Sequence, residues 1–248
     1  MTHGGAQTAG QGMLLSPIGT EALDDPSTDP ALVRRMLTDI ARANRWLGGA
    51  AAVRYGIGKL LTPEDRGATL TLVDIGTGAG DLPPRAAAVA RKRGVTLRSI
   101  GLERTPVAAR LAMHNGLPSI VGCAGSLPLR PGSVDIVLLS QVAHHLGRDA
   151  TIDLFRASSA VARRGVLVAD LRPGYFAAAG FCVAGAALAM HRITIRDGVT
   201  SLRRGYTVAA LRSLCAGAGA GHASVVPFGI GRIVAWWRTD VDSPPSIG

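Results

Sequence analysis

The sequence predicts an α/β fold, in which a mostly parallel seven-stranded sheet carries helices on both faces and ends in a final antiparallel strand. Three observations lead to this prediction. Short apolar runs alternate with Ala-rich amphipathic segments through most of the chain. One run is followed by glycines at alternate positions, which is typical of a buried strand entering a tight turn. The last two runs are separated only by residues 229–231, so these two strands must pair antiparallel.

Length and composition limit the function classes. The chain has 248 residues with 47% hydrophobic and 4% aromatic content, which suits one domain with a sizeable core and excludes general disorder. The net charge of +10 comes almost entirely from Arg and identifies no partner by itself. Cys123, Cys182 and Cys215 lack metal-ligand spacing, which favours a reducing, cytoplasmic location and argues against structural zinc.

The N-terminal part divides into two segments. Residues 1–29 are rich in Gly, Thr, Ser and Pro, and we expect a flexible tail, not a signal peptide. Across residues 30–62, apolar side chains recur at near-helical spacing and Gly48 with Gly49 interrupts the pattern, so two helices should precede the sheet.

The central stretch is residues 69–83, TLTLVDIGTGAGDLP, where a buried strand enters a glycine-rich turn and then an Ala-rich helix. Such a turn suits either the pyrophosphate of a dinucleotide or the methionine part of S-adenosylmethionine. The dinucleotide fingerprint G-x-G-x-x-G needs a glycine where this chain has Asp81. With Asp74 before the glycines as well, the turn favours a ligand that carries a sulfonium and an ammonium.

Further strands and helices alternate after this turn. A strand at 96–102 ends at Glu103, about 20 residues past the glycines, where an acid can accept the hydroxyls of a ribose. The remaining expected elements are strands at 119–123, 133–140, 165–170, 223–228 and 232–237, and helices at 84–93, 105–115, 149–163 and 208–219.

The segments VDIGTGAG, GLE, GSLP with VDIVLLS, and RRGVLVADL together resemble the class I S-adenosylmethionine-dependent methyltransferases over roughly residues 65–240. The resemblance implies a Rossmann-like methyltransferase domain at 63–240, S-adenosyl-L-methionine as cofactor, and a lid formed by residues 30–62 with Asn44, Arg45 and Tyr55 as contact candidates. Many relatives have an Asp near Cys123 that binds the adenine amino group, and this chain lacks it. The cofactor-binding candidates are Asp74, Gly76, Thr77, Gly78 and Gly80 at the methionine part, Glu103 and Arg104 at the ribose, Ser126 and Leu127 at the adenine, and Gln141.

The segment at 172–206 interrupts the alternation and is expected to form a lid insertion. Residues 174–190 contain no charge, which predicts either an apolar helix covering the sheet or a surface toward a hydrophobic substrate, a partner or a membrane, with membrane contact disfavoured. Residues 192–205 are polar and basic and are expected to form a loop.

His144 and His145, directly after the fourth strand, are the catalytic candidates, since a neutral imidazole can take a proton from an acceptor hydroxyl. If the chain turns into a helix here, only one of the two should face the acceptor, and the resemblance favours His144. The alternative is a structural role for both.

Rival chemistries are weighed by what the sequence lacks. The D/N-P-P-Y-like sequence of nucleic-acid amino-methylating enzymes is replaced by Ser-Gln-Val-Ala at 140–143, and Asp170 has no acidic partner near Gln141, so no metal is predicted. Pairs of arginines are dispersed along the sequence, which disfavours nucleic acid as a partner. The sequence therefore predicts a methyltransferase acting on a small aromatic or polyketide-type molecule, with O-methylation favoured and secondary metabolism as the setting. The alternatives are a non-catalytic donor-binding partner subunit and an RNA methyltransferase. The sequence is also compatible with a homodimer.

Overall fold

The computed structural model describes residues 21–239, which form a seven-stranded sheet with the order β3-β2-β1-β4-β5-β7-β6. Strand β7 is antiparallel to both of its neighbours, and the pairs among β1 to β5 are parallel. The predicted α/β fold and its closing antiparallel hairpin are thereby confirmed. The strands are β1 (Thr69–Ile75), β2 (Thr96–Glu103), β3 (Ser119–Val121), β4 (Val134–Ser140), β5 (Ala162–Leu171), β6 (Ser224–Phe228) and β7 (Arg232–Arg238).

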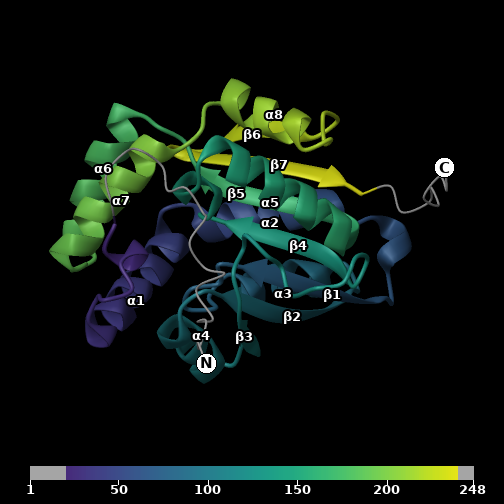
Figure 1. The fold of residues 1–248 in the computed structure, drawn as a ribbon, viewed down its shortest axis with the longest axis horizontal. Helices are drawn as coiled ribbons and strands as arrows, with labels where there is room; N and C mark the ends of the chain where they lie inside the picture. The colour runs from purple at the N-terminus through teal and green to yellow at the C-terminus, as the bar shows by residue number, and fades with distance from the viewer. Residues whose placement is uncertain (1–20, 240–248) are drawn as a thin grey trace, which may run out of the picture.

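Helices cover both faces of the sheet and one of its edges (Figure 1). Helices α2 and α3 pack on one face, and α5 and α8 pack on the other, while α1, α6 and α7 gather beyond one end of the strands. The α-helices of the described residues are α1 (Pro30–Trp46), α2 (Gly49–Leu60), α3 (Pro83–Lys92), α4 (Pro106–His114), α5 (Arg148–Val161), α6 (Tyr175–Ala187), α7 (Arg192–Arg204) and α8 (Val208–Gly217).

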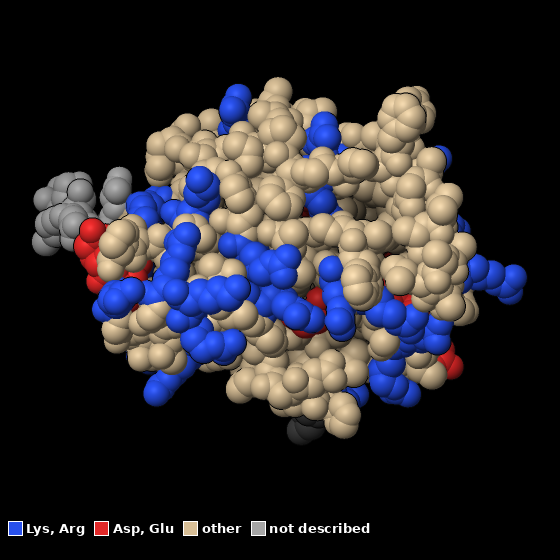
Figure 2. All heavy atoms as spheres, turned by 180° about the vertical axis from the view of Figure 1, so that it is seen from behind, with Lys and Arg blue, Asp and Glu red and all other residues tan. Residues whose placement is uncertain are grey.

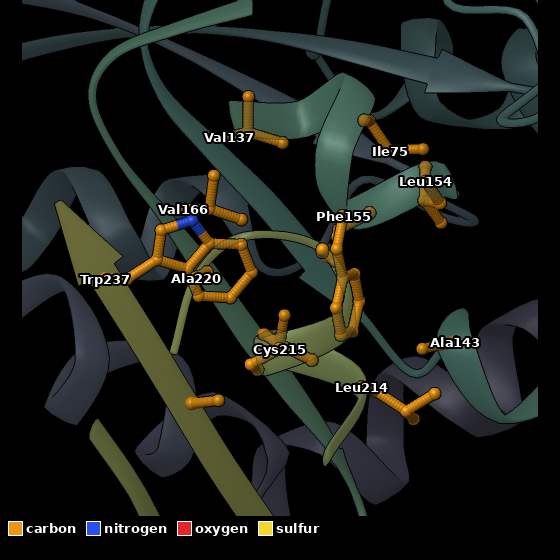
Figure 3. Packing of buried hydrophobic residues seen from close by; sticks show 14 of the residues in the cluster. Ile75, Val137, Ala143, Leu154, Phe155, Val166, Leu214, Cys215, Ala220 and Trp237 are labelled. Carbon is orange, nitrogen blue, oxygen red and sulfur yellow. The ribbon is translucent and has the colours of Figure 1, made fainter. Parts of the chain in front are cut away.

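The two apolar cores follow from the alternation of side chains along each strand. In β1, Leu72 points into the core beneath α2 and α3, and Val73 points into the core beneath α5 and α8. Figure 3 shows the second core, where Phe155 of α5 and Trp237 of β7 lie together with ring centroids 5.6 Å apart. The Trp237 indole N–H donates to Ser159 Oγ at 2.9 Å, so its one polar atom is satisfied.

Two expectations about the chain outside the sheet are wrong. Residues 192–205 form helix α7, not a loop, because Ile195 and Leu202 give it an apolar side that packs on α6. Residues 21–29 are not a free tail: they include a 3-10 helix (Ala22–Asp24), and the Ala22 amide donates to Asp197 of α7 at 2.7 Å. The rest of the expected tail, residues 1–20, lies outside the described residues.

The apolar segment at 174–190 forms α6, a helix of 13 residues that packs against α7. Its outer side leaves Tyr175, Phe176 and Val183 exposed. In the part of the chain that the structure describes, no helix has both the length and the apolar character that a membrane span requires.

Basic side chains gather on one face of the molecule. Figure 2 shows the face opposite to that in Figure 1, where Lys and Arg side chains form a band with few acidic side chains between them. Dispersal in sequence is therefore a weaker argument against nucleic acid than it was alone.

Candidate active site

A cavity of about 880 Å³ lies at the carboxyl ends of the parallel strands, under α1, α6 and α7. This is the edge at which open α/β sheets bind their ligands. The predicted residues that line it are Gly76, Thr77, Gly78, Glu103, Arg104, Gln141, His144 and His145.

The glycine turn forms one wall of the cavity. Gly76, Gly78 and Gly80 have φ values of 71°, 55° and 73°, in the left-handed region that favours glycine. Side-chain atoms of Val142 fill the space that a Cβ on Gly76 would need. Leu37 of α1 lies over Gly78, so α1 covers the turn as a lid would. The turn therefore presents bare backbone to a ligand enclosed beneath a helix.

Asp74 lies beneath the turn and does not itself line the cavity. Its Oδ2 accepts a hydrogen bond from the Thr77 hydroxyl at 2.7 Å, which fixes the first loop of the turn. Burial raises the pKa of the Asp74 carboxyl to about 8, the Thr77 hydrogen bond opposes the shift, and the charges of Asp81 and Glu103 add to it. A cationic ligand nearby would reverse part of this shift.

Glu103, expected at the ribose, joins the end of β2 to the glycine turn that follows β1. Its Oε2 accepts from the Gly78 amide at 2.9 Å, and its Oε1 accepts from the amides of Arg104 and Thr105. Three of about four lone-pair positions are thus occupied, so the carboxylate keeps one for a ribose hydroxyl, not the two expected.

The adenine end differs from the sequence-based prediction. Gly122 and Ala124 line the cavity here, whereas Ser126 and Leu127 do not. Ser126 pairs with Cys123 in a short bridge, and Leu127 packs against the core beneath α5 and α8. The structure therefore offers backbone and small side chains, but no acid, to an adenine ring.

A chain of polar side chains holds α1 over the glycine turn. Gln141 Nε2 donates to Asn44 Oδ1 at 2.7 Å, and Asn44 Nδ2 donates to Asp81 Oδ2 at 3.2 Å. The Gln141 backbone has φ 57°, a conformation that non-glycine residues adopt at a cost of roughly 1–3 kcal/mol. Of the three lid candidates only Asn44 lines the cavity, since Arg45 lies over the Trp46 ring and Tyr55 packs against Phe228 and Trp236.

His144 is held in one orientation by Asp170, at the end of β5. Its Nδ1 lies 2.6 Å from Asp170 Oδ1, and the carboxylate also accepts from the amides of Leu171 and Ala143. Burial raises the pKa of Asp170, but the charge and hydrogen bond of His144 and the Leu171 amide together lower it below its usual value. An ionised Asp170 keeps the proton on Nδ1 and leaves a lone pair on Nε2, which is buried and has no partner among the described residues.

His145 stacks on His144 with ring centroids 4.2 Å apart, and both histidines line the cavity. The segment forms a 3-10 helix (Ala143–His145), in which successive side chains point about 120° apart, so the expectation that only one histidine faces the acceptor stays a prediction. Burial lowers the pKa of His145, but the hydrogen bond that it donates to Asp24 and the charges of Glu21 and Asp24 raise this pKa above its usual value. His145 is therefore protonated more readily than an ordinary histidine.

Buried Arg204 completes this network, with Nη1 3.1 Å from Glu21 Oε1 and 3.4 Å from Asp24 Oδ2. Glu21, His144 and His145 each bring one possible metal-ligand atom within 4.8 Å of the others, and this is the only such group in residues 21–239. Arg204 and a protonated His145 already balance the two acids without a cation. The absence of a metal stays a prediction.

We expect Asp24→Asn to loosen the network in a pH-dependent way. The pKa of Asp24 is about 2: burial raises it, and His145 and Arg204 lower it below the ordinary 3.8. The stabilisation from Asp24 is therefore present above about pH 3.8 and is lost as the pH falls toward 2. The stabilisation from His145 is present below about pH 6.5 and is lost as the pH rises through the raised pKa of His145. In urea unfolding at pH 5.5, the free energy of unfolding of Asp24→Asn should be about 1 kcal/mol below that of wild type, and this difference should shrink at lower and at higher pH. Asp25→Asn, at an exposed neighbour, is the control, and equal losses in both variants would contradict the network.

Helices α6 and α7 close the far end of the cavity. Phe176, Ala177 and Phe181 of α6 line it, and the Phe181 ring packs so closely on α7 that Gly198 has no room for a side chain. Together with Leu202 of α7, these residues make an apolar wall of the cavity. This end suits an apolar ring system.

Comparisons with known proteins agree with the site. Residues 73–169 match the family model described as a methyltransferase domain, and no curated protein matches the chain in sequence. The fold is similar to an O-methyltransferase from neocarzinostatin biosynthesis solved with S-adenosylmethionine and 2-hydroxy-5-methyl naphthoic acid, with 21% identity over 90% of this chain and 62% of that chain and a TM-score of 0.57. It is also similar to human N-acetylserotonin methyltransferase in complex with S-adenosylmethionine (14% identity, 84% of this chain, 56% of that chain, TM-score 0.58). A third similar fold is magnesium protoporphyrin IX methyltransferase from Synechocystis with bound S-adenosylhomocysteine (13% identity, 78% of this chain, 84% of that chain, TM-score 0.52).

The matched residues 73–169 run from β1 to β5 and include the glycine turn, Glu103 and both histidines. The bare backbone of the turn and the acids around it fit the methionine part of a cationic donor. Residues 73–169 of this chain therefore carry a methyltransferase domain, and its fold is similar to those of methyltransferases solved with S-adenosylmethionine or S-adenosylhomocysteine.

Proposed function

We propose that the protein transfers a methyl group to a hydroxyl oxygen of a small aromatic or polyketide-type acceptor. The observation that carries the proposal is the Asp170–His144 pair, in which Asp170 orients the imidazole of a histidine that lines a cavity with an apolar wall. A phenol is weakly nucleophilic until it loses its proton, so a base at this position suits an oxygen acceptor. The similar O-methyltransferase fold with a bound naphthoic acid supports this class of acceptor.

The residues of the chain divide the task between them. The glycine turn, Glu103 and Gln141 are proposed to hold the donor, and S-adenosylmethionine supplies an electrophilic methyl group when bound. His144 Nε2 takes the hydroxyl proton of the acceptor, whose oxygen forms the new bond to carbon while the carbon–sulfur bond breaks and its electron pair stays on sulfur. Asp170 stabilises the imidazolium that forms. Helices α1, α6 and α7 exclude water from the cavity.

The proposal is tested by incubating the protein with S-adenosylmethionine and a panel of hydroxylated aromatic compounds, each paired with its amino analogue. Formation of S-adenosylhomocysteine and a methyl ether in the product, identified by mass spectrometry, is the expected result. Methylated amines without methyl ethers would contradict the oxygen acceptor. Binding of S-adenosylhomocysteine without turnover of any compound would favour the non-catalytic partner subunit.

The Phe181→Asp variant tests the apolar wall. We expect the KM of the acceptor to rise at least about tenfold with donor affinity kept, because a charge would face the bound ring and would need to remain solvated. Val183→Asp is the matched control: it lies on the same helix but is 73% exposed, and it should leave KM unchanged. A large loss of thermal stability in Phe181→Asp alone would show that the ring serves packing between α6 and α7 instead.

The basic band in Figure 2 supports the alternative of an RNA methyltransferase, since clustered Lys and Arg side chains attract phosphates. Titration of labelled tRNA at low and moderate salt separates the two functions. Binding that is weak and that methylation does not follow would leave the small-molecule acceptor as the better proposal.

A further inference from the structure

Arg232 is a buried guanidinium at the wall of the cavity. It is the first residue of β7, its exposed fraction is 6%, and its side chain lines the cavity near the tight turn of the closing hairpin. Its Nε donates to the Leu47 carbonyl at 3.3 Å, and no carboxylate oxygen of residues 21–239 lies within 4.0 Å of its nitrogens. Arginine has five N–H donors in a rigid fork, so the four on its terminal nitrogens have no protein partner in this part of the chain.

The charges around Arg232 leave it without a counter-ion. Three carboxylates of the cavity wall are occupied elsewhere, since Glu21 and Asp24 pair with Arg204, and Asp197 accepts from the Ala22 amide. A buried charge without a partner costs several kcal/mol, and here burial lowers the pKa of Arg232 to about 10.

The negative charges of Asp170 and Asp81 lie close enough to Arg232 to oppose the lowering of its pKa, but neither carboxylate pairs with Arg232 directly. Asp170 is bound to His144, and Asp81 accepts from Asn44. At neutral pH the guanidinium is therefore charged, nearly enclosed, and turned to a space that a ligand can fill.

We propose that Arg232 binds a carboxylate group of one of the two substrates, which makes an aromatic acid the favoured class of acceptor. This inference rests on the proposed function of the cavity. A carboxylate matches the two terminal nitrogens of the fork with two parallel hydrogen bonds, and in a site shielded from water such a pair is strong.

The sheet topology favours the acceptor over the donor as the source of the carboxylate. Arg232 pairs with Leu171 of β5, and β4 and β5 separate β7 from β1, which carries the glycine turn. At a spacing of about 4.8 Å between strands, the two backbones are about 14 Å apart. The methionine carboxylate of the donor is the other source of the same chemistry, and the experiment separates the two.

The test is calorimetric titration of matched acids and amides onto protein saturated with S-adenosylhomocysteine. The probes are salicylic acid with salicylamide and hydroxynaphthoic acid with hydroxynaphthamide. We expect at least one acid to bind wild type at least about tenfold more tightly than its amide, and this ratio to fall to about one in Arg232→Gln, with partial recovery in Arg232→Lys. Arg172→Gln is the matched control, because Arg172 also donates to a backbone carbonyl at this sheet edge but does not line the cavity.

A second titration identifies the source. S-adenosylhomocysteine and methylthioadenosine, which lacks the amino-acid part, are titrated onto wild type and Arg232→Gln. Selective loss for S-adenosylhomocysteine assigns the carboxylate to the donor, and unchanged donor binding with loss of the acid preference assigns it to the acceptor. If neither preference depends on Arg232, or if acid and amide weaken equally, the proposal is overturned. Failure of the proposed function has a different result: the wild-type protein would not bind S-adenosylhomocysteine at all.

Discussion

The Gly78→Val variant is expected to lose measurable binding of S-adenosylhomocysteine while it keeps the far-ultraviolet circular dichroism of the wild type. Gly78 has φ 55°, which a β-branched residue adopts only with strain, and its position faces the cavity beneath Leu37. A valine there would occupy ligand space and would disturb the amide that donates to Glu103. Both effects act at the donor, so affinity should fall by more than about a hundredfold, which corresponds to about 2.7 kcal/mol.

The matched control is Gly219→Val, since Gly219 has φ +83° but an added Cβ would meet nothing within 4 Å. This variant carries the same backbone strain away from the cavity, so it should lose some stability and keep donor binding. Calorimetry and thermal melts of both variants decide the matter. Wild-type affinity in Gly78→Val would mean that the glycine turn is not the donor site.

The His144→Gln variant is expected to lower kcat by at least about 10² with donor affinity unchanged, because general-base assistance typically contributes 10²–10⁴ in rate. The acid limb of the pH–rate profile should disappear with the base. Asp170→Asn should reproduce much of the loss although the imidazole remains, because an amide no longer keeps the proton on Nδ1.

His145→Gln is the comparison, since His145 belongs to the ion-pair network and should affect stability more than kcat. Initial rates from pH 5.5 to 9, with circular dichroism of each variant, separate chemistry from folding. Near-normal kcat and an unchanged profile in both histidine variants would show that positioning alone drives transfer, and an amine would then be the better acceptor.

The sheet was predictable from the sequence because its strands have local signals. Buried runs such as VDIVLLS are apolar throughout and end at turn residues, and the helices between them are Ala-rich. Glycines at alternate positions likewise predicted the turn that begins at Gly76. Helix α7 was missed because its composition is polar, and only contact with α6 shows why Ile195 and Leu202 matter.

The polar residues that complete the cavity were harder to predict, since their roles depend on distant partners. Glu21 and Asp24 sit in a segment with the composition of a tail, and only their pairing with Arg204 and His145 orders it. Arg232 belongs to a segment whose sequence predicts a strand, and no local pattern indicates that Arg232 binds a ligand. The order of charges around a cavity is a tertiary property, which a single sequence does not display.

The lid formed by α6 and α7 has a consequence for how this protein can diverge. Its apolar contacts centre on Leu171, Ala177 and Leu202, a cluster separate from the two cores that flank the sheet. The lid leaves the sheet at the end of β5 and returns before α8, so residues of α6 and α7 can be exchanged while the two cores that flank the sheet keep their packing. We therefore expect substitutions in this segment to change the choice of acceptor while the proposed donor site keeps its ligand.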